Sequence, residues 1–272
     1  MTFSIHDHLL YKNRKQVPFY DTPNKSGWID PKYLVIHYTA TGGSAENVGK
    51  YFQNPDANVS AHLTVGTDGT VIQSVAFNTK AWHAGRSRWD GYVGLNSHSI
   101  GIEVVNPGPL TKVSDGKYKS WFGRTYTTAQ YDIVDARHRN GGREQGWIPF
   151  TEEQNNFLLE VGAMLMKAYN LREAVGHDMI SPNRKTDPGP CMDDRIYHKL
   201  NGERSQDGDL WDYEVTSRAL NLRSGPGTSN PRVALLRRGD KVDRTAVVGN
   251  WFEVETEHGH YGYVHSNYVR KI

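Results

Sequence analysis

The sequence is poor in the features that mark disulfide-bonded, membrane-spanning and exported chains. It has one cysteine in 272 residues, Cys191, so no intramolecular disulfide can form and the fold does not depend on an oxidising compartment. No run approaches the ~20 consecutive apolar residues that cross a bilayer, which predicts no membrane insertion. The first 15 residues lack the apolar stretch of a secretory signal. We therefore expect synthesis in the cytoplasm without a signal peptide.

A large charge of one sign is also missing. The 32 Lys and Arg residues against 30 Asp and Glu residues leave a net charge of +2. A nucleic-acid-binding surface normally shows a clustered basic stripe, so we expect no nucleic-acid partner. The residues from Tyr213 onward contain nine basic and six acidic side chains, a mild surplus that suits weak attraction to an anionic polymer.

The features that are present predict two folded domains. At ~150 residues per domain, the length favours two compact units. Residues 201–212, NGERSQDGDLWD, are polar and contain glycine without helical periodicity, as is typical of linkers between cores. We predict one domain over residues 1–200, this linker, and a second domain over 213–272.

The first domain alternates strand-like and helix-like segments, which predicts an α/β fold with a mixed central β-sheet flanked by helices. The expected elements are strands at 33–38 and 99–105, a hairpin at 62–75, helices at 44–53 and 151–169, and a weaker helix at 129–138. After the linker, short strand-length runs are separated by Gly, Pro and Asn with no helix candidate. This pattern predicts a small all-β barrel.

A few side chains stand where the predicted fold would expose acid–base or metal chemistry. His37 ends a buried strand, Glu103 interrupts an apolar one, and His177 precedes a proline-rich loop with Lys185 and Asp187. Two histidines and a carboxylate form a catalytic zinc set with a position left for water. A nearby carboxylate and an ammonium could then move protons and stabilise an oxyanion. Each of the twelve histidines could instead be a surface or structural residue.

A resemblance to a known family favours catalytic metal chemistry over a surface or structural role for these residues. LVIHYTAT, SAHLTVGTDGTVIQ, AWHAG, SIGIEVVN and GHDMISPNRKTDPGP follow the order and approximate spacing of the zinc-dependent N-acetylmuramoyl-L-alanine amidases. That superfamily includes phage lysins, wall-recycling amidases and peptidoglycan-recognition proteins. The resemblance covers roughly residues 30–200. It implies an amidase that cleaves the bond between N-acetylmuramic acid and the L-alanine of the stem peptide with zinc-activated water.

The resemblance also carries roles to single positions. It implies that one Zn²⁺ per chain is held by His37, His177 and Asp187, that Glu103 is the general base and then acid, and that Lys185 stabilises the oxyanion. The catalytic set is intact, whereas non-catalytic recognition members typically lose a zinc ligand. A muropeptide-binding protein without activity is the alternative, and a zinc peptidase acting within the stem peptide is a third.

Other residues of the first domain have two interpretations. His62, Trp82 and His83 either line the cleft and bind substrate or serve packing and backbone orientation. Cys191 is interpreted as inert packing, because Asp187 already fills the third ligand position. Tyr118, Trp121 and Tyr126 lie in an insertion that either borders the cleft or covers a sheet edge, and no site is assigned there. His138 is treated as a surface residue.

The C-terminal segment resembles a bacterial SH3-type domain through ALNLRSGPGTS, GNWFEVET and GYVHSNYV. Such modules commonly bind wall peptides, with a structural or oligomerisation role as the alternative. Trp251, Tyr261 and Tyr263 are the expected groove residues. Peptidoglycan and muropeptides are thus the expected partners, and the sequence does not specify the oligomeric state. An enzyme with a wall module and no signal suggests a phage or prophage endolysin, or an effector, that reaches the wall after release or delivery.

Overall fold

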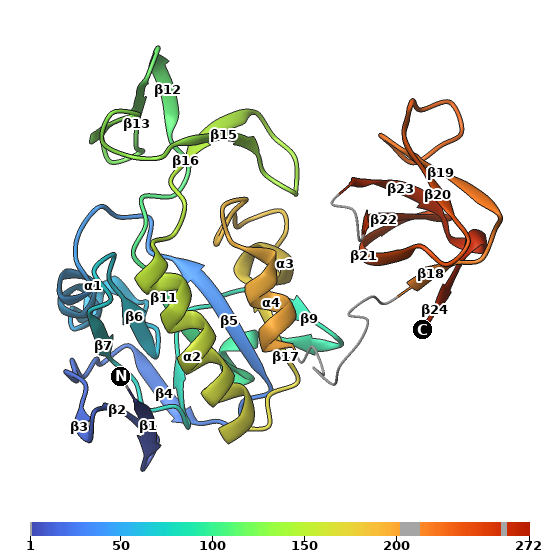
Figure 1. Cartoon of the computed structure of the whole chain (residues 1–272). Coiled ribbons are helices and arrows are strands. Elements are labelled where there is room, and N and C mark those ends of the chain that lie inside the picture. Colours follow the sequence, from blue (N-terminus) through green and yellow to red (C-terminus); the bar gives the residue numbers. More distant parts are fainter. Residues whose placement is uncertain (1, 202–212, 257–259) are drawn as a thin grey trace. The chain divides into compact units, whose positions relative to one another are not determined.

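The computed structural model describes residues 2–201, 213–256 and 260–272, and it divides into two compact units, Met1–Gly202 and Glu203–Ile272 (Figure 1). The predicted linker, residues 201–212, lies outside the described residues apart from Asn201. No helix among the described residues is long and apolar enough to cross a membrane.

A five-stranded mixed sheet forms the centre of the first unit, as predicted. Its order is β17-β5-β11-β6-β7, and only β7 runs antiparallel to its neighbour. The strands are β5 (Tyr33–Tyr38), β6 (Leu63–Val65), β7 (Val71–Gln73), β11 (Ser99–Val104) and β17 (Glu173–Gly176). The parallel strands therefore bring their carboxyl ends to one edge of the sheet.

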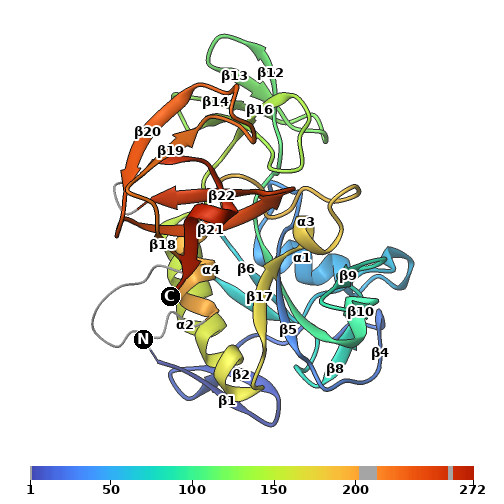
Figure 2. The same ribbon diagram turned by 90° about the vertical axis from the view of Figure 1, so that its right-hand side faces the viewer.

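Two helices, α2 (Glu152–Ala168) and α4 (Asp194–Leu200), cover one face of this sheet (Figures 1 and 2). Thr151 and Gln154 form the predicted capping box at the start of α2. The sheet face beneath these helices is apolar, with Leu34 and Ile36 of β5 buried in the main core. Side chains alternate along a strand, so the neighbouring positions of β5 point to the opposite face.

The opposite face carries α1 (Ala45–Phe52), α3 (His177–Ile180) and the 3₁₀ turns Pro55–Ala57 and Leu95–Ser97. Ser44 caps α1, whose predicted range was 44–53. Tyr33 and Val35 of β5 pack there against Leu95, Val175 and Ile180. The same alternation places His37 on this face.

Small β elements that the sequence did not predict surround this unit. They are β1 (Phe3–His6), β2 (Leu9–Lys12) and β3 (Lys15–Gln16) in one sheet, β4 (Lys25–Trp28) paired with β8 (Thr79–Ala81), and β9 (Arg88–Trp89) paired with β10 (Tyr92–Val93).

An insertion between β11 and α2 contains a three-stranded sheet and a hairpin. The sheet consists of β12 (Thr111–Ser114), β13 (Lys117–Lys119) and β14 (Thr125–Thr127), and the hairpin of β15 (Val134–Arg137) and β16 (Glu144–Trp147). The helix predicted over 129–138 is therefore wrong. β15 instead pairs with β16, and Gly141 and Gly142 adopt positive φ angles in the connecting turn, which glycine allows at no steric cost.

The second unit is the predicted all-β domain. Seven strands follow the order β20-β19-β23-β22-β21-β18-β24. They are β18 (Tyr213–Val215), β19 (Ala219–Arg223), β20 (Arg232–Arg237), β21 (Lys241–Val248), β22 (Trp251–Thr256), β23 (Tyr261–His265) and β24 (Val269–Lys271), with a 3₁₀ turn at Ser266–Tyr268. Val215, Leu222, Val242, Val254 and Val264 are fully buried in a core of its own.

Candidate active site

The carboxyl ends of the parallel strands bring three potential metal ligands together. His37 is near the end of β5, His177 follows β17 directly as the first residue of α3, and Asp187 lies in the loop after α3. Ligand sites of open α/β sheets lie at this edge. The three residues are 1%, 1% and 6% exposed, so their polar atoms must find partners within the protein or in a bound group.

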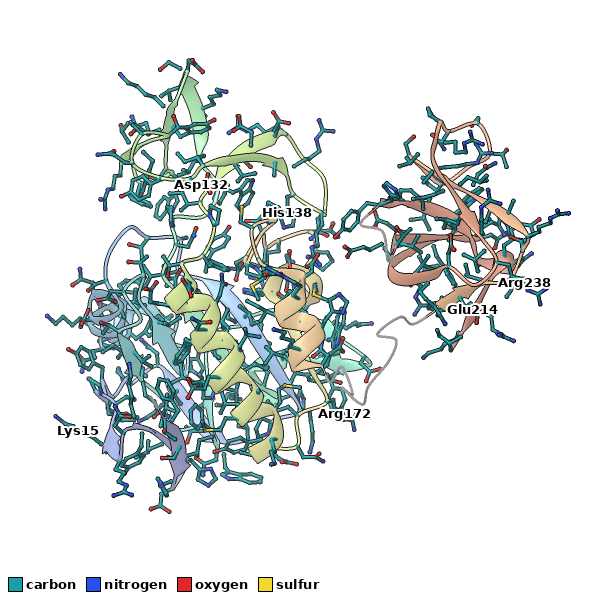
Figure 3. The ribbon with its side chains drawn as sticks, viewed as in Figure 1. Lys15, Asp132, His138, Arg172, Glu214 and Arg238 are labelled. Carbon is teal, nitrogen blue, oxygen red and sulfur yellow. The ribbon has the colours of Figure 1, made fainter. Side chains whose placement is uncertain are left out.

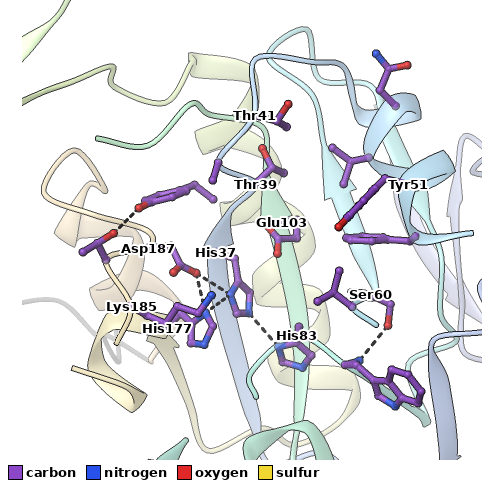
Figure 4. Close-up of a pocket in the computed structure, with 18 of the residues that line it drawn as sticks. His37, Thr39, Thr41, Tyr51, Ser60, His83, Glu103, His177, Lys185 and Asp187 are labelled. Carbon is purple, nitrogen blue, oxygen red and sulfur yellow. Dashed lines mark hydrogen bonds and ion pairs between the residues drawn. The ribbon is translucent and has the colours of Figure 1, made fainter. Parts of the chain in front are cut away.

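The three side chains converge on one point (Figure 4). The Oδ2 atom of Asp187 lies 2.9 Å from Nδ1 of His37 and 2.8 Å from Nδ1 of His177, and the two Nδ1 atoms are 2.9 Å apart. Two imidazole nitrogens and one carboxylate oxygen form a donor set that zinc prefers. Among the described residues this is the cluster able to hold a metal ion, and Cys191 is not part of it.

Two groups lie next to Nε2 of His177. The carbonyl oxygen of Ala84 is 3.1 Å away and Nη2 of Arg184 is 3.2 Å away, so this nitrogen faces both an acceptor and a donor. The other ring nitrogen, Nδ1, lies 2.8 Å from Oδ2 of Asp187 and thus faces the cluster.

A chain of hydrogen bonds orients the ring of His37. The Ser99 hydroxyl donates to the Leu95 carbonyl at 2.6 Å, so its oxygen is left to accept from Nε2 of His83, 3.3 Å away. His83 then accepts at Nδ1 from Nε2–H of His37 at 2.9 Å. Burial lowers the pKa of His37 to about 4, which keeps the ring neutral. Its Nδ1 lone pair is thereby directed at Asp187 and His177.

Space for this chain comes from a glycine. Gly101 stands in β11 between Ser99 and Glu103 on the same face, and a Cβ atom there would lie 2.6 Å from the His83 ring. The missing side chain lets the imidazole lie on the sheet next to His37.

Glu103 lies beside the cluster on the neighbouring strand. It is opposite His37 in the parallel register of β11 and β5, and its Oε2 is buried without a hydrogen-bond partner among the described residues. Burial, with the nearby Asp187 charge, raises its pKa to about 8, although Lys185 opposes the shift. A carboxyl group in this state can both take and return a proton at near-neutral pH.

A cavity of about 660 Å³ opens over these residues, within the usual range for ligand sites. His37, Glu103, His177, Lys185 and Asp187 all line it (Figure 4). A second hollow of about 530 Å³ adjoins it. The residues that the two share are Val59, Trp82, His83, Arg184 and Lys185.

The structure gives the three residues expected to bind substrate three different environments. Trp82 lines both hollows, and its indole N–H donates to Ser26 Oγ at 3.1 Å. His83 borders both but uses its two nitrogens in the chain to His37. His62 is fully buried and lines neither hollow. Its nitrogens bond the Gly101 amide and the Thr79 carbonyl, which argues against direct substrate contact.

The sequence did not predict the contact between His138 and Asp178, which lies next to the cluster. His138, expected at the surface, is only 7% exposed, and its Nε2 lies 3.0 Å from Oδ2 of buried Asp178, the residue after His177. Figure 3 shows His138 at the end of the β15–β16 hairpin that approaches α3. Asn140 adds a hydrogen bond to the Asp178 carbonyl at 3.0 Å. Forty residues separate His138 from Asp178 in the chain, so no local pattern could have revealed the pair.

The second unit has a hollow of its own, of about 280 Å³. Trp251, the one expected groove residue among its lining, stands there with Arg223, His265 and Tyr268. Tyr261 and Tyr263 do not line it, and the Tyr263 hydroxyl donates to Glu253 at 2.9 Å.

Comparisons with known proteins agree with this geometry. Residues 27–190 match the family described as N-acetylmuramoyl-L-alanine amidase, and residues 218–270 match the bacterial SH3 domain. The chain is 32% identical over 167 residues to the 1,6-anhydro-N-acetylmuramyl-L-alanine amidase AmpD of Citrobacter freundii, an alignment that spans 61% of this chain and 66% of that protein.

Two further relatives and one solved structure extend the comparison. AmpD of Haemophilus influenzae is 30% identical over 65% of this chain and 85% of its own. The N-acetylmuramoyl-L-alanine amidase AmiD of Escherichia coli is 30% identical over 59% of this chain and 50% of its own. A crystal structure of an AmpD selenomethionine derivative covers 73% of this chain and 99% of its own, with a TM-score of 0.50 and 23% identity, which shows a common fold.

The amidase match spans more than half of the chain and contains all five residues of the cluster and its neighbours, from His37 to Asp187. The curated relatives share that region, although the chain spans only about two thirds of the Citrobacter protein and 54% of AmpD of Escherichia coli. This protein therefore belongs to the zinc-dependent N-acetylmuramoyl-L-alanine amidase family and carries a C-terminal bacterial SH3 domain.

Proposed function

We propose that this protein hydrolyses the amide bond between the lactyl group of N-acetylmuramic acid and the L-alanine of the stem peptide. The observation that carries the proposal is the convergence of His37, His177 and Asp187 beside Glu103 in an open cavity. The residues fit zinc, because two imidazole nitrogens and one carboxylate oxygen lie within 4.8 Å of one another. The names of the relatives support this choice of bond.

Glu103 and Lys185 have separate roles in the proposed reaction. When bound, zinc supplies a Lewis acid that polarises the scissile carbonyl and makes water more acidic. Glu103 takes a proton from the attacking water and returns it to the alanine nitrogen as the C–N bond breaks. The Lys185 ammonium, which lines the same cavity, donates a hydrogen bond to the carbonyl oxygen as negative charge grows there. The products are a lactyl carboxylate and a free amine.

The charges around the cavity suggest how the substrate lies. Lys80, Arg184 and Lys185 line the second hollow, and none of its lining residues, all of them within the described part of the chain, is acidic. A stem peptide carries free carboxylates, whereas the muramic sugar ring is neutral. The second hollow therefore suits the peptide side of the scissile bond.

Product analysis tests the reaction directly. Mass spectrometry of digested sacculi should show a muramic lactyl carboxylate together with a free L-alanine amine. New amines within the stem peptide would establish the peptidase alternative, and unchanged sacculi the binding-protein alternative.

A matched pair of variants tests the role of Glu103. Glu103→Gln should retain one zinc per chain and lose ~10²-fold or more in rate, the scale of a general acid–base group. Glu144→Gln, at an exposed position, should match the wild type. Loss of zinc by Glu103→Gln would contradict the assignment of Glu103 as a proton carrier.

We further assign residues 213–272 to wall binding, with 1–200 as the catalytic part and 201–212 as the link. The hollow at Trp251 and the basic surplus support this role, since tethering raises the local concentration of enzyme on a polymer. Trp251→Ala should co-sediment less with purified sacculi than the wild type. Tyr261→Ala is the control, because Tyr261 is an exposed aromatic outside the hollow. Equal sedimentation of all three proteins would favour a structural or oligomerisation role.

A wall-binding amidase of this kind fits an endolysin or a delivered effector that acts on the wall after release. Bacteria that express the chain in the cytoplasm should grow until the inner membrane is permeabilised and should then lyse. Cells producing Glu103→Gln provide the control for membrane damage alone. Continued turbidity after permeabilisation would contradict this role.

A further inference from the structure

The insertion between β11 and α2 presents an aromatic side chain to the catalytic cavity. Its sheet has a small core of its own, in which Leu110, Tyr118 and Tyr126 are buried. The turn from β13 to β14 is closed by hydrogen bonds between Ser120 and Arg124. Trp121 lies in this turn and lines the main cavity. The insertion is thus an ordered support that ends in an indole.

Two hydrogen bonds hold the turn against the loop between β5 and α1. The indole N–H of Trp121 donates to the Ala40 carbonyl at 2.9 Å, and the Arg124 guanidinium donates to the Gly42 carbonyl at 2.9 Å. A Cβ atom at Gly42 would lie 2.6 Å from the Tyr126 hydroxyl, so the insertion and the loop are in close contact. Because His37 lies three residues before Ala40, the turn is attached directly next to the catalytic edge.

The indole is held in place yet remains 77% exposed. Its one polar atom is already bonded, so the rest of the side chain is a flat apolar surface in contact with water. A ligand that covered this area would gain free energy from its burial. A fixed aromatic plane provides a large contact area at little cost in conformational entropy. The feature thus suits a ligand with a flat, uncharged face.

The position of Trp121 indicates which part of the substrate its side chain would contact. Trp121 lines the main cavity but not the second hollow, whose cations suit the anionic peptide. On the other side of the scissile amide the substrate carries a neutral saccharide, whose ring has apolar C–H faces. We propose that Trp121 stacks on a saccharide ring of the glycan and that the β12–β14 insertion is a sugar-recognition element. This inference rests on the proposed function, because the amide places the sugar beside the cavity.

Substrates with and without sugar test the proposal. One carries the tripeptide on N-acetylmuramic acid, and the other carries the same tripeptide on D-lactate alone, so that both contain the same amide. Trp121→Ala should raise KM for the muramyl substrate about 3- to 10-fold, a range set by aromatic contacts, with little change in kcat. The loss should shrink below twofold on the lactyl substrate, and Trp121→Phe should recover most of the affinity.

Trp28→Ala provides the matched control. Trp28 is 74% exposed in β4 and lines neither hollow, so its removal should alter neither substrate's kinetics. An equal loss on both substrates, or no loss with Trp121→Ala, would overturn the proposal.

A binding measurement separates this proposal from the proposed function. If the wild type cleaves neither substrate, the proposed function fails, and calorimetric titration with the muramyl tripeptide still tests Trp121. Trp121→Ala should then bind about 3- to 10-fold more weakly than the wild type and Trp28→Ala. Equal affinities of the three proteins would overturn the role of Trp121 whatever the reaction.

Discussion

The two faces of the central sheet use the same strands for opposite purposes. On the face covered by α2, β5 contributes Leu34 and Ile36 to an apolar core. On the other face, the same strand contributes His37, whose ring takes part in a buried polar network with His83 and Asp187. The first face gains free energy from burial, whereas the second must satisfy every polar atom that it encloses.

One strand can therefore serve both stability and chemistry. Because side chains alternate along a strand, each face can be optimised without altering the other. Damage to the apolar face should therefore lower stability and spare the chemistry of the site. Damage to the polar face should affect zinc binding and catalysis.

The largest effect should come from a ligand on the polar face. His177→Ala removes one of three converging donor atoms, so we expect loss of stoichiometric zinc and of activity on sacculi. Metal analysis after dialysis and a turbidity assay measure the two losses. His6→Ala, at an exposed histidine, should retain both. Full lysis by the wild type in excess chelator would contradict the metal role altogether.

Leu34→Ala makes the corresponding test of the apolar face. Leu34 is fully buried, so truncation should cost about 2–5 kcal/mol in the free energy of unfolding. Zinc content and kcat of the folded variant should stay at wild-type values. Denaturant unfolding and metal analysis provide the measurements. Zinc loss from a variant that is still folded would show that the two faces are coupled.

The sequence predicted much of the apolar face, and the three candidate metal ligands that it singled out converge in the structure. The short apolar strand runs and the capping box at Thr151 are local signals, and the resemblance singled out His177 and Asp187. Local signals failed where pairing partners lie far apart in the chain. Residues 134–137 have no strong strand signal of their own, and their conformation depends on the hydrogen bonds to residues 144–147.

The contacts of the polar network could not be predicted from the sequence, for a related reason. The contact of His83 with His37 requires Gly101 to leave space and Ser99 to act as acceptor, and neither requirement is visible in the motif AWHAG. The contact between His138 and Asp178 also joins distant segments. Such contacts depend on the assembled sheet and not on local periodicity.

A smaller effect is expected from His83, which contacts His37 and acts through it. His83→Ala removes the acceptor that holds the Nε2 proton of His37, so zinc affinity should fall 10- to 100-fold, the usual range for groups that orient a ligand. Competition with a chromophoric chelator measures this affinity directly. His83→Gln, whose amide oxygen can accept the same proton, should recover part of it. Unchanged zinc affinity in His83→Ala would restrict His83 to packing.

The smallest effect is a pH dependence that belongs to the polar face alone. In the zinc-free protein, burial lowers the pKa of His37 and of His62 to about 4 from 6.5 and raises that of Glu103 to about 8 from 4.5. The unfolded histidines bind more protons than the folded ones between pH 4 and 6.5, so their contribution to stability rises with pH there. Folded Glu103 binds more protons than unfolded Glu103 between pH 4.5 and 8, so its contribution falls as pH rises.

At pH 6.5 the unfolded histidines are still half protonated, and His83 is buried with a lowered pKa as well, so the Glu103 contribution dominates the change only above about pH 7. The free energy of unfolding of the zinc-free protein should therefore fall from about pH 7 to 8, by less than about 1.4 kcal/mol per pH unit. Glu103→Gln should remove this fall, whereas Leu34→Ala should retain it at a lower overall stability. Urea unfolding in the presence of chelator at several pH values gives the slopes. Zinc should flatten the wild-type slope, because a nearby positive charge favours the carboxylate form of Glu103. An equal slope in Glu103→Gln and the wild type would assign the pH dependence to groups outside the polar face.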